Sequence, residues 1–251
     1  MRRVDDPHAT VADIAIVIPL LGDLGPLRAL LGRIAGWNRQ PREIIVVDAA
    51  ADTQLEAFCE RRGCLYRVSE ACRGKQQDTG ARSARADILW FLHADATPGP
   101  SSVGEIAEAI AHGTEGGHFR FRFSGTRMLR KTAIEWLTNL RVRLGGIPYG
   151  DQGIFVRRDI YLKCGGFPHQ PLFEEVSLVR ALRSRGRFRT LSMPLGVSPR
   201  RWEQDGWLRR CLENRRLALE YGRGQTAHRL AERYDPPNRM PADAADCGPR
   251  T

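Results

Sequence analysis

The sequence lacks the features that define several protein classes. Its six cysteines form no Cys-x-x-Cys pair, and no histidine follows them at the spacing of a zinc ligand. We therefore expect free thiols and no zinc site. The apolar run near the N-terminus has only about eight residues, too few to cross a membrane. It predicts a first strand in a cytoplasmic protein.

Negative charge is scarce, and this deficit favours anionic partners. The chain has 39 lysines and arginines against 29 aspartates and glutamates, which gives a net charge of +10. Such a balance suits phosphates, nucleic acid or an acidic membrane surface. Basic and aromatic residues interleave only in "HFRFRF", where Phe119, Phe121 and Phe123 alternate with arginines. Alternation places these rings on the side away from the arginines, in the core, so we expect no nucleic-acid binding.

Apolar runs and helical spacings alternate through the first half of the chain. The predicted strands cover residues 14–18, 42–50, 64–69 and 88–95, and the predicted helices cover residues 25–37, 53–63 and 75–84. This order predicts parallel strands joined by right-handed crossovers. In the second half we expect helices over residues 100–113, 128–146, 172–186 and 207–222, strands over 116–125 and 188–194, and a strand, short helix and glycine turn over 152–168.

The length of 251 residues suits one large α/β domain. We expect a flexible N-terminus over residues 1–12 and a single domain over residues 13–234. Within it, residues 13–100 would form a nucleotide-binding half and residues 101–234 an acceptor half. Residues 235–251 carry little apolar material to pack and are predicted to be disordered.

Acidic residues follow several of the predicted strands and turns. They are Asp23, Asp48, Asp95, Glu174 and Glu175. The carboxyl ends of parallel strands meet along one edge of a sheet, so these side chains should gather there. Carboxylates gathered in a basic protein indicate a divalent cation and, behind it, a phosphate.

Six motifs stand in one order along the chain: "IVIPLLGD", "EIIVVDAAAD", "CRGKQQDTGARSARADILWFLHAD", "GIPYGDQGIFVRRDIYLKCGGFP", "PLFEEVSLVRALRSRG" and "SPRRWE". From about Ile14 to Tyr234 the sequence resembles a family 2 glycosyltransferase with the GT-A fold. More narrowly, it resembles the bacterial subgroup linked to arsenosugar biosynthesis. The resemblance implies a mixed, mainly parallel central sheet with helices on both faces.

The resemblance also implies a role for individual residues. The implied donor-binding residues are Pro19, Asp23, Asp48, Arg73, Lys75, Asp95 and Arg201. Asp95 is the last residue of a DxD-like element and would bind Mg²⁺ or Mn²⁺. Glu175 would be the catalytic base. Asp151, Glu174 and Trp202 would lie on the acceptor side.

The activity implied is that of an inverting, hexosyltransferase-type glycosyltransferase. It would move a sugar from a nucleoside-diphosphate sugar to the hydroxyl group of an unidentified acceptor. The departing diphosphate needs cationic stabilisation, and the acceptor needs one carboxylate base. Amides at the start of the helix after "GGFP" should favour the charged form of Glu175.

Departures from the family pattern leave a second interpretation open. They occur at Gly22, Ala49 to Ala51, Asp78, His93 and Glu175. A protein with an altered pocket could bind nucleotide sugars with weak or lost transferase activity. Asp48 could simply cap a loop, and Glu174 and Glu175 could simply favour the positive end of a helix. Arg201 could be a solvated surface residue.

The helix expected from Trp207 to Tyr221 is amphipathic and basic. Leu208, Cys211, Leu212 and Leu219 share one of its faces. This face predicts peripheral contact with an anionic membrane, on its inner side. Packing of the same face into the core is the alternative.

Overall fold

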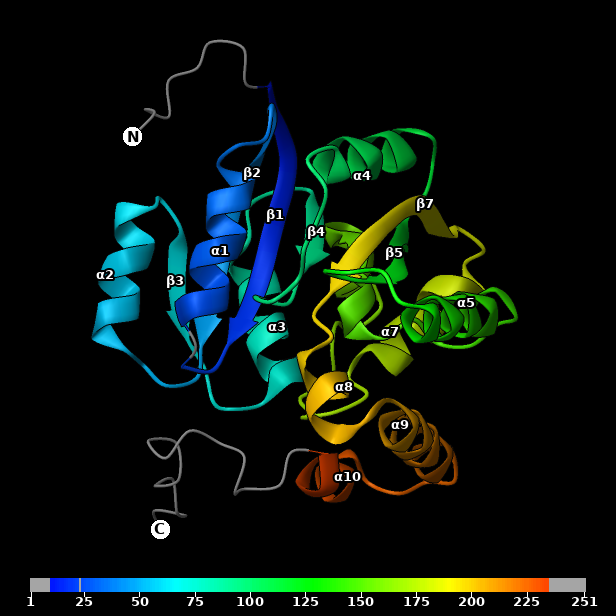
Figure 1. The fold of residues 1–251 in the computed structure, drawn as a ribbon. Coiled ribbons are helices and arrows are strands. Elements are labelled where there is room, and N and C mark those ends of the chain that lie inside the picture. The colour runs from blue at the N-terminus through cyan, green and yellow to red at the C-terminus, as the bar shows by residue number, and fades with distance from the viewer. Residues whose placement is uncertain (1–9, 23, 235–251) are drawn as a thin grey trace.

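The computed structural model describes residues 10–22 and 24–234 (Figure 1). The predicted donor-binding residue Asp23 lies outside the described residues. So do residues 1–9 of the expected flexible N-terminus and the expected disordered tail, residues 235–251. Residues 10–12, also expected to be flexible, belong to the first strand.

A seven-stranded sheet in the order β3-β2-β1-β4-β6-β5-β7 forms the centre of the molecule. The strands are β1 (Thr10–Leu20), β2 (Arg39–Asp48), β3 (Leu65–Val68), β4 (Ile88–Phe91), β5 (Gly116–Phe123), β6 (Phe155–Arg157) and β7 (Phe188–Val197). All neighbouring pairs are parallel except those that β6 makes with β4 and β5. The sheet is therefore mixed and mainly parallel, as predicted.

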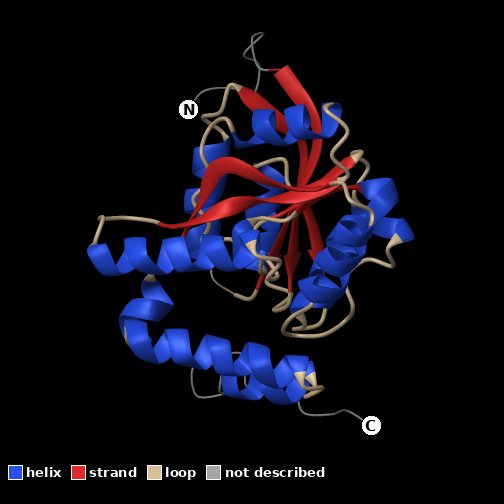
Figure 2. Ribbon diagram, turned by 90° about the vertical axis from the view of Figure 1, so that its right-hand side faces the viewer, coloured by secondary structure: helices blue, strands red, loops and turns tan. Residues whose placement is uncertain are grey.

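Helices cover both faces of this sheet (Figures 1 and 2). They are α1 (Leu24–Ile34), α2 (Thr53–Arg61), α3 (Arg73–Ser83), α4 (Ser102–Ala111), α5 (Leu129–Arg143), α6 (Arg158–Lys163), α7 (Glu175–Ser184), α8 (Arg200–Asp205), α9 (Trp207–Gly222) and α10 (Ala227–Tyr234), with a short 3₁₀ helix, η1 (Gly150–Gln152). Within the described ranges, no helix is both long and apolar enough to cross a membrane.

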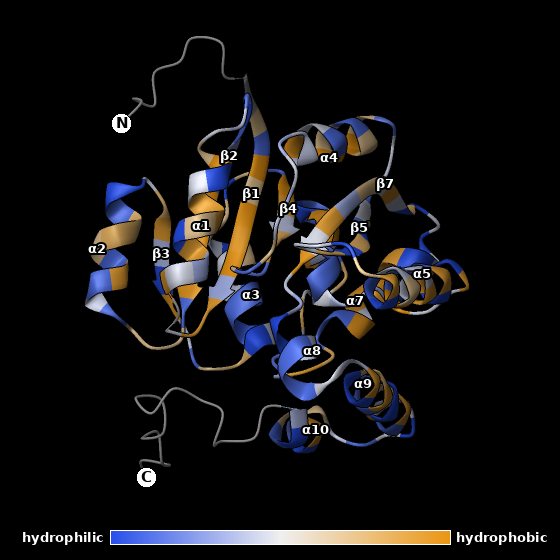
Figure 3. Cartoon of the chain, in the orientation of Figure 1, coloured by the Kyte–Doolittle hydropathy of each residue, from blue (hydrophilic) through white to orange (hydrophobic). Residues whose placement is uncertain are grey.

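The strand β1 joins the two main hydrophobic clusters. Ile14, Ile16 and Ile18 pack with α1, α2 and α4 on one face of the sheet. Ala15 and Val17, which alternate with them, pack with α3, α6 and α7 on the other face. Because side chains alternate along a strand, a strand that is buried on both faces is apolar throughout. Figure 3 shows this apolar strand at the centre of the sheet.

The first strand does not end at residue 18, as the sequence predicted, but continues through Pro19 to Leu20. The amide of Leu92 donates to the carbonyl of Val17, and the amide of Ala49 donates to that of Leu20. Backbone groups alternate in direction along a strand, so Pro19 faces the β4 side of β1, beyond the last β1–β4 pair at Val17 and Phe91. A proline, which has no N–H, is tolerated there.

The C-terminal helices add a third hydrophobic cluster. Leu217 of α9 and Leu230 of α10 pack against Leu172, Phe173 and Val176. The sequence did not predict α8 or α10, because both are short and α8 has no buried residue. This cluster fixes the chain on both sides of the acidic pair at the start of α7.

Candidate active site

The carboxyl ends of β1, β2 and β4 lie at one edge of the sheet. Gln76 of α3 joins two of them, because its amide nitrogen donates to the carbonyls of Leu20, at 2.7 Å, and Val47, at 3.0 Å. Figure 1 shows α3 beside this edge and α8 to α10 beyond it. Gln76 is buried. A glutamine within a polar helix carries no distinctive local pattern, so the sequence does not indicate this role.

A tight contact positions the start of α3. The amide of Gly74 donates to the carbonyl of Gln170 at 3.1 Å. A Cβ atom on Gly74 would lie 2.1 Å from the carbonyl oxygen of Pro168, so only glycine fits. This approach places Arg73 beside the acidic pair, with its Nε atom 3.9 Å from Oε1 of Glu174.

The residue before the acidic pair adopts a rare backbone conformation. Phe173 has a φ of 60°, in the left-handed region that costs a non-glycine residue about 1–2 kcal/mol. Its ring is held between Tyr149, at 5.8 Å between ring centroids, and Tyr221, stacked at 4.6 Å. Both glutamates that follow are buried. Backbone strain held in place by packing is typical of functional sites.

The carboxyl group of Glu175 accepts a hydrogen bond from the amide of Gly150 at 3.0 Å. Burial, followed by the neighbouring charge of Glu174, raises the pKa of Glu175 to about 8. Nearby backbone amides lower this pKa, but their effect is smaller than that of burial. The backbone amides therefore favour the charged form of Glu175, as expected, but desolvation outweighs them and the pKa rises.

Glu174 and Asp151 belong to the same group of acids. Burial raises the pKa of Glu174, while the positive charge of Arg73 opposes that rise. Asp151 lies in η1, next to the residue that donates to Glu175. Burial and the charges of Glu175 and Asp95 raise its pKa to about 7. Two carboxyl groups therefore titrate close to neutral pH, which suits proton transfer.

Asp95 lies in the turn that follows β4, at the same edge of the sheet. Its side chain is accessible to solvent, yet the surrounding protein desolvates it and raises its pKa. The charges of Arg201, Arg73 and Arg200 oppose this rise. The carboxylate thus lies in positively charged surroundings, where an anionic ligand would also be stabilised.

His93 is neutral and lies next to Gly150, whose amide binds Glu175. Burial and the charges of Arg73 and Arg201 lower its pKa to about 3. Its Nε2 atom is buried and has no hydrogen-bond partner among the described residues. A Cβ atom on Gly150 would lie 3.0 Å from this nitrogen. His93 therefore packs against Gly150 and, being neutral, adds no positive charge to the site.

Asp48 is fully buried and caps the loop after β2. Its two oxygens accept hydrogen bonds from the amides of Ala50 and Asp52, at 3.1 and 3.0 Å, and from the hydroxyl of Tyr66, at 2.9 Å. The loop-capping alternative accounts for the two amide contacts, and the Tyr66 contact joins Asp48 to β3. Because the loop's own amides already occupy the carboxylate of Asp48, a sugar nucleotide bound here would contact that loop.

The other predicted site residues lie in different surroundings. Pro19 is half-buried at the end of β1, and Lys75 forms an ion pair with Glu70. The guanidinium of Arg201 lies 5.2 Å from the centre of the Tyr234 ring, and its charge reaches His93 and Asp95. Trp202 instead packs against Phe123 and stacks on Trp207 in an aromatic cluster. Of the predicted basic residues, Arg73 lies beside Glu174, and the charges of Arg73 and Arg201 reach Asp95.

The carboxylate of Asp95 suits a divalent cation that is bound partly by the protein and partly by a phosphate ligand. Across residues 10–22 and 24–234, no cluster of three or more histidines, cysteines or acids is arranged to hold a metal ion alone. Mg²⁺ typically takes one or two carboxylates together with phosphate oxygens and water. Asp95, accessible and beside two arginines, can supply one such carboxylate.

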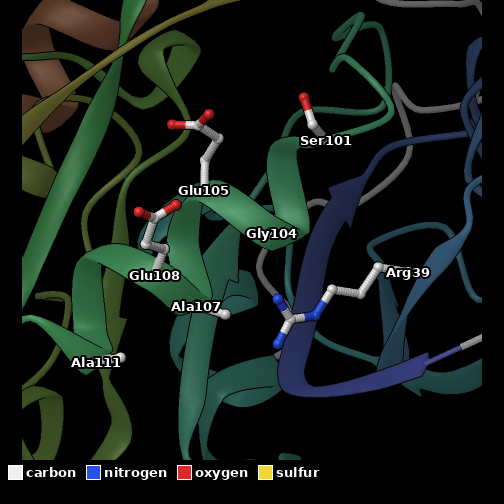
Figure 4. A pocket seen from close by; sticks show the side chains of 7 residues that line it. All are labelled: Arg39, Ser101, Gly104, Glu105, Ala107, Glu108 and Ala111. Atoms are coloured by element: carbon white, nitrogen blue, oxygen red, sulfur yellow. The ribbon is translucent and has the colours of Figure 1, made fainter.

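A separate hollow of about 500 Å³ lies between α4 and the start of β2 (Figure 4). It is lined by Arg39, Ser101, Gly104, Glu105, Ala107, Glu108 and Ala111. Arg39 begins β2 and Asp48 ends it, so this hollow lies at the opposite edge of the sheet from the acids.

Several solved structures, a mannosyltransferase among them, share the fold of this chain. That of S. aureus TarS 1-349 with UDP-GlcNAc has a TM-score of 0.55 at 14% identity, covering 74% of this chain and 58% of that chain. The mannosyltransferase PcManGT from Pyrobaculum calidifontis, in complex with GDP-Man and Mn²⁺, gives 0.51 at 17% identity and covers 72% and 55%. Glucosyl-3-phosphoglycerate synthase from Mycobacterium tuberculosis, with Mn²⁺, UDP and glucosyl-3-phosphoglycerate, gives 0.53 at 18% identity and covers 72% and 70%. This chain has the GT-A fold.

Residues 15–165 match the family described as Glycosyl transferase family 2. That match covers more than half of the chain, so the chain belongs to glycosyl transferase family 2. Its sequence has no significant match among curated proteins. The chain spans about three fifths of the length of the TarS structures, 58% in one and 60% in another.

Proposed function

We propose that this protein is an inverting glycosyltransferase that uses a nucleoside-diphosphate sugar. The observation that carries the proposal is the buried acidic pair Glu174 and Glu175, held beside Arg73 at the carboxyl edge of a GT-A sheet. Solved structures of the same fold contain UDP, UDP-GlcNAc or GDP-Man. Membership of the subgroup linked to arsenosugar biosynthesis stays a prediction that rests on the sequence alone.

In this proposal the donor diphosphate lies against the positive side of the site. Arg73 and Arg201 supply positive charge around Asp95. They stabilise the negative charge that develops as the bond from the sugar to the diphosphate breaks. A divalent cation held by Asp95 and the diphosphate would neutralise part of the same charge. Lys75 and Pro19 border the donor, and Asp48 supports the adjoining loop.

Glu175 is our candidate for the base. Its carboxylate would accept the proton of the acceptor hydroxyl as that oxygen attacks the anomeric carbon. The diphosphate leaves from the opposite face with the bonding electrons, so the configuration inverts. A pKa of about 8 makes Glu175 a strong carboxylate base that is ionised in a minority of molecules at pH 7. Activity should therefore rise with pH up to about 8.

Asp151 is the alternative base, because its pKa is about 7 and it lies in the same group of acids. The two candidates differ in the pH at which activity reaches its plateau. The Asp151→Asn variant should keep the rise toward pH 8 if Glu175 is the base. The Glu175→Gln variant should lose activity by roughly 10²-fold or more. The reverse pattern would assign the base to Asp151.

The direct test is release of nucleoside diphosphate from a panel of nucleotide sugars, with and without Mn²⁺. At least one donor should be consumed by the parent protein, and Glu175→Gln should bind that donor with nearly unchanged affinity while turning it over slowly. A protein that binds a nucleotide sugar without consuming it would favour the second candidate function, a nucleotide-sugar-binding protein. The substitutions at Gly22, Ala49 to Ala51 and Glu175 are the features that favour this alternative.

A further inference from the structure

The helix α5 packs with its polar side inward. Its buried residues are Lys131, Glu135 and Val142. The strand β5 pairs with β6 only at Gly116 and Gly117, so the remainder of that edge needs other hydrogen-bond partners.

Side chains of α5 supply those partners. The amide of Phe123 donates to Oε1 of Glu135 at 2.9 Å. The amide of Phe121 donates to Oδ1 of Asn139, and Nδ2 of Asn139 donates to the Phe121 carbonyl, both at 2.9 Å. Because these polar groups must face β5, the apolar residues of α5 are left on the outside.

Four large apolar residues occupy that outer side. Leu129 is 92% exposed, Trp136 61%, Leu137 56% and Leu144, directly after the helix, 78%. At 100° per residue they fall within about 100° of one another around the helix axis. Single exposed leucines are ordinary, but a continuous apolar stripe marks a surface that meets a partner.

The helix α9 presents a similar stripe. Leu208, Leu212 and Leu219 are exposed, opposite the buried Arg210 and Leu217. The core-packing alternative for these leucines is therefore wrong, because the other side of α9 enters the core. The guanidinium of Arg130 in α5 lies 5.1 Å from the centre of the Trp207 ring in α9, so the two helices meet. Their contact lies at the first turn of each helix, and Figure 1 shows α5 and α9 on the same, right-hand side of the molecule.

We call these seven residues the α5–α9 face: Leu129, Trp136, Leu137, Leu144, Leu208, Leu212 and Leu219. The charges around it are predominantly positive. The only acid of α5, Glu135, is buried, whereas Arg130 and Arg143 are exposed. On α9, Glu213 and Glu220 are each paired with an arginine of the same helix.

Exposed apolar side chains surrounded by arginines favour one kind of partner. A second copy of the chain, meeting the face with its own, would bring arginines against arginines. An anionic bilayer satisfies both properties, because acyl chains receive the apolar side chains and lipid phosphates receive the arginines. We propose that the α5–α9 face docks this protein onto an anionic membrane surface, with α5 and α9 lying in the interface.

Flotation of the full chain with lipid vesicles tests the proposal. The parent should float with vesicles of equal parts phosphatidylglycerol and phosphatidylcholine at low salt, and with phosphatidylcholine alone it should bind much less. The variant Leu129→Ser, Trp136→Ser, Leu137→Ser should bind the anionic vesicles at least about tenfold more weakly, because each lost apolar side chain removes burial in the bilayer. Leu162→Ser, at an exposed leucine of α6, is the matched control and should bind like the parent.

Sedimentation of the parent and the triple variant without lipid completes the test. The proposal expects both to be monomers with the same far-UV circular dichroism and the same affinity for UDP with Mn²⁺. Failure of the parent to float at low salt would overturn it, as would a triple variant that floats as well as the parent. A parent dimer that the triple variant abolishes would assign the face to a second copy instead. None of these results depends on transferase activity.

Discussion

Replacing Glu175 by glutamine should stabilise the protein while it removes the base. Burial and the charge of Glu174 raise the pKa of Glu175 from 4.5 to about 8. In the unfolded chain the carboxyl group is ionised above pH 4.5, so between pH 4.5 and about 8 the parent takes up a proton when it folds. A raised pKa contributes stability that is present at low pH and is lost as the pH rises through this window.

The expected magnitude follows from that single proton. The free energy of unfolding of the parent should fall, relative to that of Glu175→Gln, by about 1.4 kcal/mol for each pH unit between about pH 5 and pH 8. Glutamine does not titrate, keeps the shape of the side chain and can still donate a hydrogen bond to Glu174. Urea unfolding at four pH values across this range measures the difference directly.

Glu70→Gln is a suitable control for this experiment. Glu70 is exposed, and its ion pair with Lys75 lowers its pKa, so it is ionised above pH 5 in both the folded and the unfolded chain. Its variant should differ from the parent by a constant amount over the same range. A constant difference for Glu175→Gln as well would show that Glu175 is already ionised in the folded protein, and the reasoning about its burial would be refuted.

Three further substitutions test the supporting structure. Gly74→Ala should destabilise the protein by about 1–3 kcal/mol in urea unfolding, because its Cβ would lie 2.1 Å from the Pro168 carbonyl; an unchanged midpoint would contradict that contact. Asp48→Ala should cost about 1–3 kcal/mol in the same assay, because it removes a buried acceptor of three hydrogen bonds, whereas a neutral effect would show that Asp48 does not hold this loop and is available to bind the sugar nucleotide. Ala51→Gly should raise stability by up to about 1 kcal/mol, since Ala51 has a φ of 53°; a loss in thermal unfolding would argue against strain there.

The architecture of the first half could be predicted from local patterns. Continuous apolar runs predict buried parallel strands, and alternation in "HFRFRF" correctly predicted that Phe119, Phe121 and Phe123 are buried. The antiparallel insertion of β6 between β4 and β5 could not be predicted, because pairing between distant segments leaves no local period. The inverted packing of α5 was also missed, since it depends on an open edge of β5 that only the sheet order creates.

The candidate site was also predicted in part, because local patterns give the positions of its residues but not their surroundings. Strand ends give the positions of Asp48 and Asp95, and the glycine turn gives that of the acidic pair. Spacing along the chain cannot tell that Asp48 is enclosed by its own loop, nor that burial outweighs the helix amides at Glu175. Ionisation depends on how much water the assembled fold removes, and this is a property of several segments together.

Calorimetric titration of UDP and of GDP into the protein, with and without Mn²⁺, tests the central claim most directly. We expect at least one nucleoside diphosphate to bind the parent with Mn²⁺ present and to bind far more weakly without it. Asp95→Ala should lose the metal-dependent part of the binding and keep the parent circular dichroism spectrum, because Asp95 is exposed and supports no buried contact of the core. A parent that binds neither nucleotide with Mn²⁺, or an Asp95→Ala variant with unchanged metal-dependent affinity, would contradict the account.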